Sequence, residues 1–163
     1  MSLVIVYYSE YNNTKAAAEY LAGKTQAVLV RLRGAGGVNP LKSLLQATAN
    51  PQNDIGAQIA EHERLILMSP IYAFNGVPEI RGFLKHADLR GKRVAIITSG
   101  LAVEGRFSTK VSGQYRELIE QAGGKVELIL HHQGGKFQAF SGEAFMQQQV
   151  DTILPRIEEW LRG

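Results

Sequence analysis

The feature that most constrains this chain is an alternation of strand-like and helix-like segments that repeats five times. The strand-like segments are continuous apolar runs at residues 3–8, 28–32, 65–68, 94–98 and 126–130. Continuous apolar runs are typical of strands buried on both faces of a parallel sheet. Five such strands separated by helices predict an α/β fold with a mostly parallel sheet and right-handed crossovers.

Two apolar stripes with helical spacing lie in the second half of the chain. One follows the spacing of a single helix face from Val111 to Ala122,. Ser108 or Thr109 is predicted to cap the start of this helix, and the pair at 123–124, Gly-Gly, to end it,. The sequence therefore predicts a helix here with a marked start and a marked end.

The second stripe runs from Met146 to Leu161 and contains Pro155. Because proline lacks the backbone N–H, a kink or a break is predicted at that residue. Pro78 is predicted to open a helix over 78–87, since proline is tolerated at the first helical position,.

The least regular stretch covers residues 34–63. Glycines from Gly34 onward and Pro40 predict a loop, followed by a short helix over 41–49,. The segment at 50–54, Asn-Pro-Gln-Asn-Asp, predicts a break, and a second short helix is expected over 55–62,.

Composition is that of one globular domain covering residues 1–163, with 45% hydrophobic and 20% charged residues,. The chain has no cysteine, which excludes disulfides, thiolate metal sites, iron–sulfur clusters and cysteine nucleophiles,. No run approaches the roughly 18 apolar residues of a membrane span. The N-terminus has neither the basic region nor the cleavage site of a signal peptide,. We therefore expect a cytoplasmic protein without a membrane span.

The net charge of +3 arises entirely in residues 81–163. An excess this small, without a concentrated basic patch, argues against nucleic-acid binding. The one basic cluster, Arg90, Lys92 and Arg93, precedes an apolar run and is predicted to consist of solvated charges at the entry to a strand,.

The loop at residues 9–14 joins the first strand to the first predicted helix. It reads Ser-Glu-Tyr-Asn-Asn-Thr, so it offers hydroxyls, amides and backbone N–H groups at a helix N-terminus. Those are the groups that hold a phosphate. The loop has no glycine, but Asn12 and Asn13 tolerate left-handed backbone angles better than most residues,. The alternative is an ordinary strand–turn–helix in which Thr14 caps the helix.

Two further loops follow the third and fourth strands, at the sheet edge where open parallel sheets bind ligands. The loop at 69–78 carries Tyr72 and Phe74, where solvent is expected. A ring there can stack on a flat ligand, or both rings can pack beneath the loop. The loop at 98–106 contains small residues that let the backbone approach a ligand closely,.

The first loop resembles the flavodoxin phosphate loop, S-x-T-G-N-T. Ser9, Asn13 and Thr14 match that pattern, whereas Tyr11 stands in place of the threonine and Asn12 in place of the glycine.

Two later segments resemble the same superfamily. Residues 69–72 are similar to the flavodoxin segment S-P-x-Y, and residues 70–78 to the P-x-Y-N-F-x-x-P loop of azoreductases and NADPH-dependent FMN reductases. The block at 91–97 resembles the G-K-K-V-A-L fourth strand.

This resemblance implies a flavodoxin-like three-layer sandwich, with a five-stranded parallel sheet of order 2-1-3-4-5, and FMN as the cofactor. The first loop would hold the phosphate, Tyr72 or Phe74 would flank the isoalloxazine, and residues 98–105 would line its other side. The cofactor-binding residues implied are Ser9, Tyr11, Asn12, Asn13, Thr14, Pro70, Ile71, Tyr72, Phe74, Asn75, Gly76, Thr98, Ser99, Gly100 and Gly105.

The function that this implies is an FMN oxidoreductase that takes a hydride from NADH or NADPH and reduces a quinone, an azo or nitro compound, or free flavin. One alternative is a flavodoxin-type electron carrier for a redox protein, although such carriers are usually acidic. Another is a flavodoxin-like scaffold that has lost flavin. No catalytic side chain is implied, because the cofactor carries the chemistry.

No metal site is expected. His131 and His132 are adjacent on a strand, so their side chains point to opposite faces and cannot easily chelate one ion,. A homodimer or larger assembly is expected, because Ile71, Tyr72, Phe74 and Val77 are predicted to form an exposed apolar cluster,.

Overall fold

The computed structural model describes residues 2–34, 55–101 and 105–163. The glycine-rich loop beyond Gly34 and the helix predicted over 41–49 lie outside the described residues. The strands are β1 (Leu3–Tyr7), β2 (Val28–Arg31), β3 (Arg64–Pro70), β4 (Arg93–Gly100) and β5 (Lys125–Gln133). The helices are α1 (Asn13–Thr25), α3 (Ile55–Ala60), α4 (Pro78–His86), α5 (Arg106–Gln121) and α6 (Glu143–Arg162).

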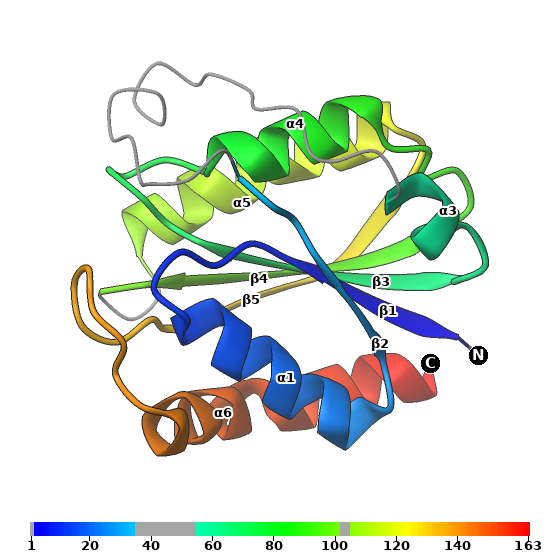
Figure 1. The fold of residues 1–163 in the computed structure, drawn as a ribbon. Helices are drawn as coiled ribbons and strands as arrows, with labels where there is room; N and C mark the ends of the chain where they lie inside the picture. Colours follow the sequence, from blue (N-terminus) through cyan, green and yellow to red (C-terminus); the bar gives the residue numbers. More distant parts are fainter. Residues whose placement is uncertain (1, 35–54, 102–104) are drawn as a thin grey trace.

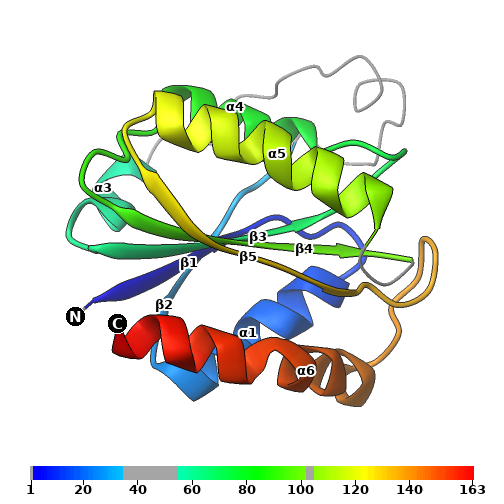
Figure 2. The same cartoon turned by 180° about the vertical axis from the view of Figure 1, so that it is seen from behind.

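The five strands form one parallel sheet in the order β2-β1-β3-β4-β5. This confirms the predicted architecture and strand order. Helices α1 and α6 cover one face, and α4 and α5 cover the other, with α3 beside them (Figure 1). Figure 2 shows the same three layers from behind. No helix in the described parts of the chain is long and apolar enough to cross a membrane.

Burial differs between the middle and the edges of the sheet. Every residue of β1 and β3 is buried, as the continuous apolar runs predict. Strands β2 and β5 form where they were predicted, but the prediction that they are buried on both faces is wrong, because most of their residues are partly or fully exposed. These two strands lie at the edges of the sheet, where the helical layers cover them incompletely.

Two helix boundaries differ from the sequence prediction. Helix α5 begins at Arg106 with Gly105 as its N-cap, so neither Ser108 nor Thr109 is the cap. The Ser108 hydroxyl instead lies inside the first turn, accepts a hydrogen bond from the Gly105 N–H (2.9 Å) and donates one to its carbonyl (2.8 Å). Gly123, with φ +88°, follows the end of α5 as predicted.

Helix α6 is not broken at Pro155. It runs from Glu143 to Arg162 as one helix, because its buried face continues on both sides of the proline, at Val150, Ile153 and Ile157. Burial of that face outweighs the single backbone hydrogen bond that the proline removes. Helix α4 begins at Pro78, as predicted.

The basic cluster before β4 is only partly solvated, which corrects the sequence prediction. Arg90 is exposed and pairs with Asp88. Lys92 is buried, and its Nζ donates hydrogen bonds to the carbonyls of Ile59 (2.8 Å) and His62 (2.7 Å), where α3 ends. Lys92 therefore ties α3 to the sheet, because helix C-termini leave carbonyl groups unpaired.

Candidate functional site

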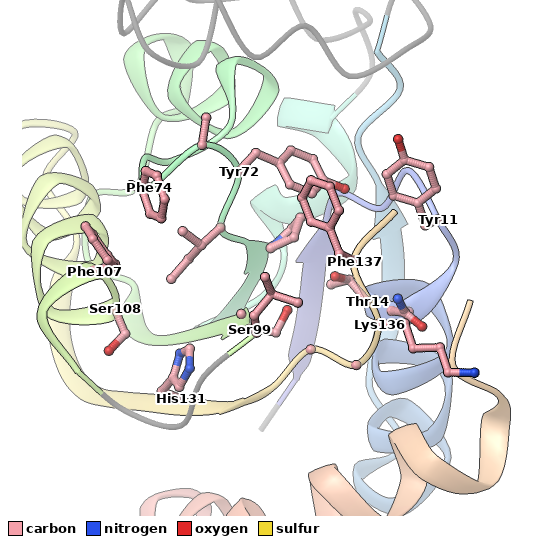
Figure 3. A pocket seen from close by; sticks show the side chains of 18 of the residues that line it. Tyr11, Thr14, Tyr72, Phe74, Ser99, Phe107, Ser108, His131, Lys136 and Phe137 are labelled. Carbon is pink, nitrogen blue, oxygen red and sulfur yellow. The ribbon is translucent and has the colours of Figure 1, made fainter. Parts of the chain in front are cut away.

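A cavity of about 680 Å³ opens beyond the carboxyl ends of the central strands. Its volume is in the range of small-molecule and cofactor sites, and its place is where open parallel sheets bind ligands. Loops that follow β1, β3, β4 and β5 form its walls (Figure 3). The implied residues that line it are Ser9, Tyr11, Asn13, Thr14, Pro70, Ile71, Tyr72, Phe74, Ser99, Gly100 and Gly105.

The wall after β1 is built by the start of α1. Asn12 is the N-cap and has φ 65°, the left-handed conformation that its side chain was predicted to tolerate,. The alternative with Thr14 as the cap is wrong, since Thr14 lies within the first helical turn and lines the cavity. The first N–H groups of α1 have no partner within the helix, so this end of the cavity attracts an anion.

Ser9 is the residue of this wall that most clearly indicates a ligand. Its side chain is buried, lines the cavity, and its Oγ has no hydrogen-bond partner among the described residues. A buried hydroxyl without a partner costs free energy of folding, and such groups are uncommon. A ligand with acceptor oxygens at this end of the cavity would supply the missing partner.

The wall after β3 is a tight turn. The backbones of Tyr72 and Asn75 exchange two hydrogen bonds, of 3.0 and 2.9 Å, and the two residues between them, Ala73 and Phe74, both have positive φ (46° and 61°). This conformation is strained for residues with side chains. The Phe74 ring lines the cavity, is exposed, and contacts the ring of Phe107 at a centroid distance of 4.5 Å.

The buried Tyr115 of α5 is hydrogen-bonded to residues on both sides of this turn. Its hydroxyl accepts a hydrogen bond from the Val77 N–H (2.9 Å) and shares one with Ser69 (2.8 Å). Burial raises the pKa of Tyr115 to about 12, so the hydroxyl keeps its proton. The prediction that Val77 is exposed is wrong, because Val77 is fully buried at the start of α4. Phe74 is exposed, whereas Tyr72 is half-buried.

Four implied residues lie outside the cavity lining and have other contacts. Asn12 is the helix cap. Asn75 closes the turn and accepts a hydrogen bond from Lys110 (2.7 Å). Gly76 packs against Tyr115, whose Oη would lie 2.6 Å from an added Cβ. Thr98 is buried in β4, and its hydroxyl is hydrogen-bonded to Nδ1 of His131 (2.9 Å).

The wall after β5 was not predicted. Residues 134–138, Gly-Gly-Lys-Phe-Gln, line the cavity, as does His131. Figure 3 shows Phe137 and Lys136 on the same side of the cavity as Tyr11 and Thr14, opposite Phe74 and Phe107. The signal in the sequence was a glycine pair followed by a cation and an aromatic residue directly after a strand. Like the three earlier loops, this loop follows the carboxyl end of a strand in a parallel sheet, where ligands bind.

The other unpredicted lining residues are at the start of α5 and in the turn after β3: Ala73, Arg106, Phe107 and Ser108. Leu101, which belongs to the range 98–105 implied by the resemblance, also lines the cavity. The predicted residues 102–104 lie outside the described residues. The charged side chains of the described lining are Arg106 and Lys136, and both are basic.

No family model matches the chain, and no curated protein matches it. Solved structures do match over nearly the whole chain. The oxidised flavodoxin 2 of Bacillus cereus has a TM-score of 0.62 and 18% identity, covering 98% of this chain and 99% of that one. A flavodoxin, WrbA-like protein of Agrobacterium tumefaciens has a TM-score of 0.59 and 16% identity, covering 93% and 96%.

The chain has the flavodoxin-like fold. A further match is the general stress protein 14 of Treponema denticola, solved in complex with FMN, with a TM-score of 0.62 and 11% identity over 98% of this chain and 99% of that one. At these identities the likeness concerns the fold alone, and a shared fold does not determine which ligand the cavity of this flavodoxin-like chain holds.

Proposed function

We propose that this chain binds FMN and passes electrons through it from NADH or NADPH to a small acceptor. The observation that carries the proposal is the buried, unpartnered Ser9 hydroxyl in the cavity wall beside the start of α1. A phosphate at that position would accept a hydrogen bond from Ser9 and from the free N–H groups of the first helical turn. FMN is a flavin that carries such a phosphate.

The remaining walls suit the flat ring of a flavin. Ile71, Tyr72 and Phe74 would contact the ring from the loop after β3, and Ser99 and Gly100 from the end of β4. Among the solved structures of the same fold, at least one protein holds FMN, which supports the choice of ligand. The bound cofactor would supply hydride and electron transfer, whereas the chain would bind it, orient it and limit access of water.

The acceptor would be a quinone, an azo or nitro compound, or free flavin. Phe74, Phe107 and Phe137 leave large apolar surfaces exposed at the cavity mouth, which suit a flat acceptor or the apolar face of a second subunit,. A homodimer thus remains part of this proposal. The basic lining residues Arg106 and Lys136 argue against an acidic carrier surface,.

The enzyme and the carrier differ in how the bound cofactor is reduced. With FMN bound and oxygen removed, NADH or NADPH is expected to bleach the flavin absorbance directly, on the time scale of turnover. The measurement is stopped-flow absorbance with each nicotinamide in turn. Bound FMN that neither nicotinamide reduces would support the carrier instead. A colourless protein that takes up no added FMN would support the scaffold that has lost flavin.

A further inference from the structure

We propose that Lys136 makes this site selective for the phosphorylated flavin, and that Asn13 acts as a positioning residue by tying the loop of Lys136 to the start of α1. The proposal rests on the proposed function, since it concerns how FMN would be held. It gives Asn13 a role other than the direct phosphate contact that the family resemblance implies.

The amide side chain of Asn13 is already used within the protein. Its Nδ2 donates a hydrogen bond to the Ala139 carbonyl (2.8 Å), and its Oδ1 accepts one from the Ser141 N–H (2.9 Å). Asn13 therefore binds the loop between β5 and α6 as a neighbouring strand would, with one donor and one acceptor. This link joins residues that are more than a hundred positions apart in the sequence.

The same loop is fixed at two more points. The Gly134 N–H donates to the Gly100 carbonyl (2.6 Å), which holds the loop to the end of β4. The Ser141 hydroxyl accepts a hydrogen bond from the Lys136 N–H (2.6 Å), which closes the loop on itself. Gly135 has φ +84°, and an added Cβ would lie 2.2 Å from the Ser141 Oγ, so this turn requires glycine,.

These contacts fix the backbone of Lys136 at the phosphate end of the cavity. Figure 3 shows Lys136 and Thr14 on the side of the cavity opposite Phe107, with the Lys136 ammonium pointing away from the middle of the cavity. The other charged lining residue, Arg106, is next to Phe107 in the sequence and begins α5. Lys136 is thus the lysine that lines the cavity near α1 in the described part of the chain. Its long flexible stem lets the ammonium turn toward an anion there.

A phosphate at the start of α1 would carry close to two negative charges. The helix N-terminus contributes about half a positive charge, and the Ser9 and Thr14 hydroxyls are neutral donors. Lys15, also in the first turns of α1, faces Glu19 (3.7 Å) and does not line the cavity. Lys136 would supply the missing positive charge, and riboflavin, which lacks the phosphate, would gain nothing from it.

The test compares FMN with riboflavin on the full chain. Their binding is measured by quenching of flavin fluorescence for the wild type, Lys136→Ala, Lys136→Arg and the control Lys85→Ala. Lys85 is exposed on α4 and outside the cavity lining, so its loss matches the change in net charge. We expect Lys136→Ala to weaken FMN binding about tenfold, riboflavin binding less than about twofold, and the FMN effect to shrink in high salt. Lys136→Arg should retain most of the preference.

A double-mutant cycle tests the role of Asn13. Asn13→Ala is expected to lower the preference for FMN over riboflavin, and Lys136→Ala is expected to have a much smaller effect when added to Asn13→Ala. Full additivity would overturn the positioning role. Equal FMN affinity in Lys136→Ala and Lys85→Ala, or equal losses for both flavins, would overturn the role of Lys136 while the proposed function stands. Failure of the wild type to bind either flavin would overturn both.

Thermal unfolding of the ligand-free variants separates binding from folding. Lys136 is exposed, so its replacement is expected to leave the unfolding temperature unchanged,. If Asn13→Ala lowers that temperature, Ser141→Ala provides a second variant, because it removes the hydrogen bond to the Lys136 N–H without touching α1. Loss of the FMN preference in Ser141→Ala supports the proposal, and an unchanged preference in both variants contradicts it.

Discussion

Replacing Ser9 by alanine is expected to weaken FMN binding about 10- to 100-fold while leaving the ligand-free fold as stable as before, or more stable. The expected loss corresponds to one hydrogen bond to a charged group, about 1.5–3 kcal/mol. The ligand-free protein loses no hydrogen bond, because the Ser9 Oγ has no partner among the described residues. FMN affinity should therefore fall without any loss of stability, whereas replacing a serine with a purely structural role would lower the stability.

The matched control is Ser112→Ala. Ser112 lies on α5, is buried, does not line the cavity, and its hydroxyl also has no partner among the described residues. Both variants are measured by FMN titration and by urea unfolding. We expect similar stability in the two variants but a loss of FMN affinity only in Ser9→Ala. Equal affinities would show that Ser9 does not contact the phosphate.

The second large effect is a loss of stability in mild acid, caused by His132. This side chain is buried, its Nδ1–H donates to the Gln133 carbonyl (2.9 Å), and its Nε2 has no partner among the described residues. Burial lowers the pKa of His132 from 6.5 to about 4; the Gln133 carbonyl opposes this shift, and nearby His131 adds to it. The folded protein therefore keeps this imidazole neutral in a range where the unfolded chain protonates it.

The direction of the stability change follows from which state of the protein binds the proton. Below pH 6.5 the unfolded chain binds a proton at His132, and the folded chain does not do so until about pH 4, so the free energy of unfolding falls as the pH falls through this window,. At about 1.4 kcal/mol per pH unit the loss approaches about 3 kcal/mol. Above pH 7 the residue contributes no pH dependence.

Urea unfolding from about pH 7.5 down to about pH 4.5 measures this loss. His132→Gln is expected to remove most of the slope, whereas His86→Gln, which replaces an exposed histidine on α4, should leave it unchanged. The window stays above the range where Glu127 titrates: burial opposes its ionisation, but the Arg93, Trp160 and Lys125 side chains hold its pKa at about 2. A slope in His132→Gln equal to that of the wild type would contradict the assignment.

The apolar runs were sufficient for a parallel five-stranded α/β sheet, whereas its strand order and the individual lining residues of the first two cavity walls were implied by the resemblance to flavodoxins. Apolar runs mark strands because burial on both faces requires them, and β1 and β3 meet that requirement fully. Edge strands carry the same pattern with less burial, so β2 and β5 could not be told apart from the central strands. Local patterns report which residues are apolar, not how many layers cover them.

The missed features depend on contacts between distant residues. Asn13 has a phosphate-loop residue type, yet its amide is bound by Ala139 and Ser141, which no local motif indicates. The local sequence predicts Val77 in an exposed apolar cluster, but its N–H donates a hydrogen bond to the hydroxyl of Tyr115, which is distant in the sequence. The local sequence predicts a solvated charge at Lys92, but its Nζ donates a hydrogen bond to the Ile59 carbonyl at the end of α3. Each correction is a tertiary contact that replaces water.

Binding of FMN through its phosphate is tested by titrating the purified, flavin-free wild-type chain with FMN and with riboflavin, followed by flavin fluorescence. We expect saturable quenching by both flavins, with FMN bound at least about tenfold more tightly, because only FMN offers a phosphate to Ser9 and the start of α1,. Equal affinities for the two flavins, or no binding of FMN, would contradict it.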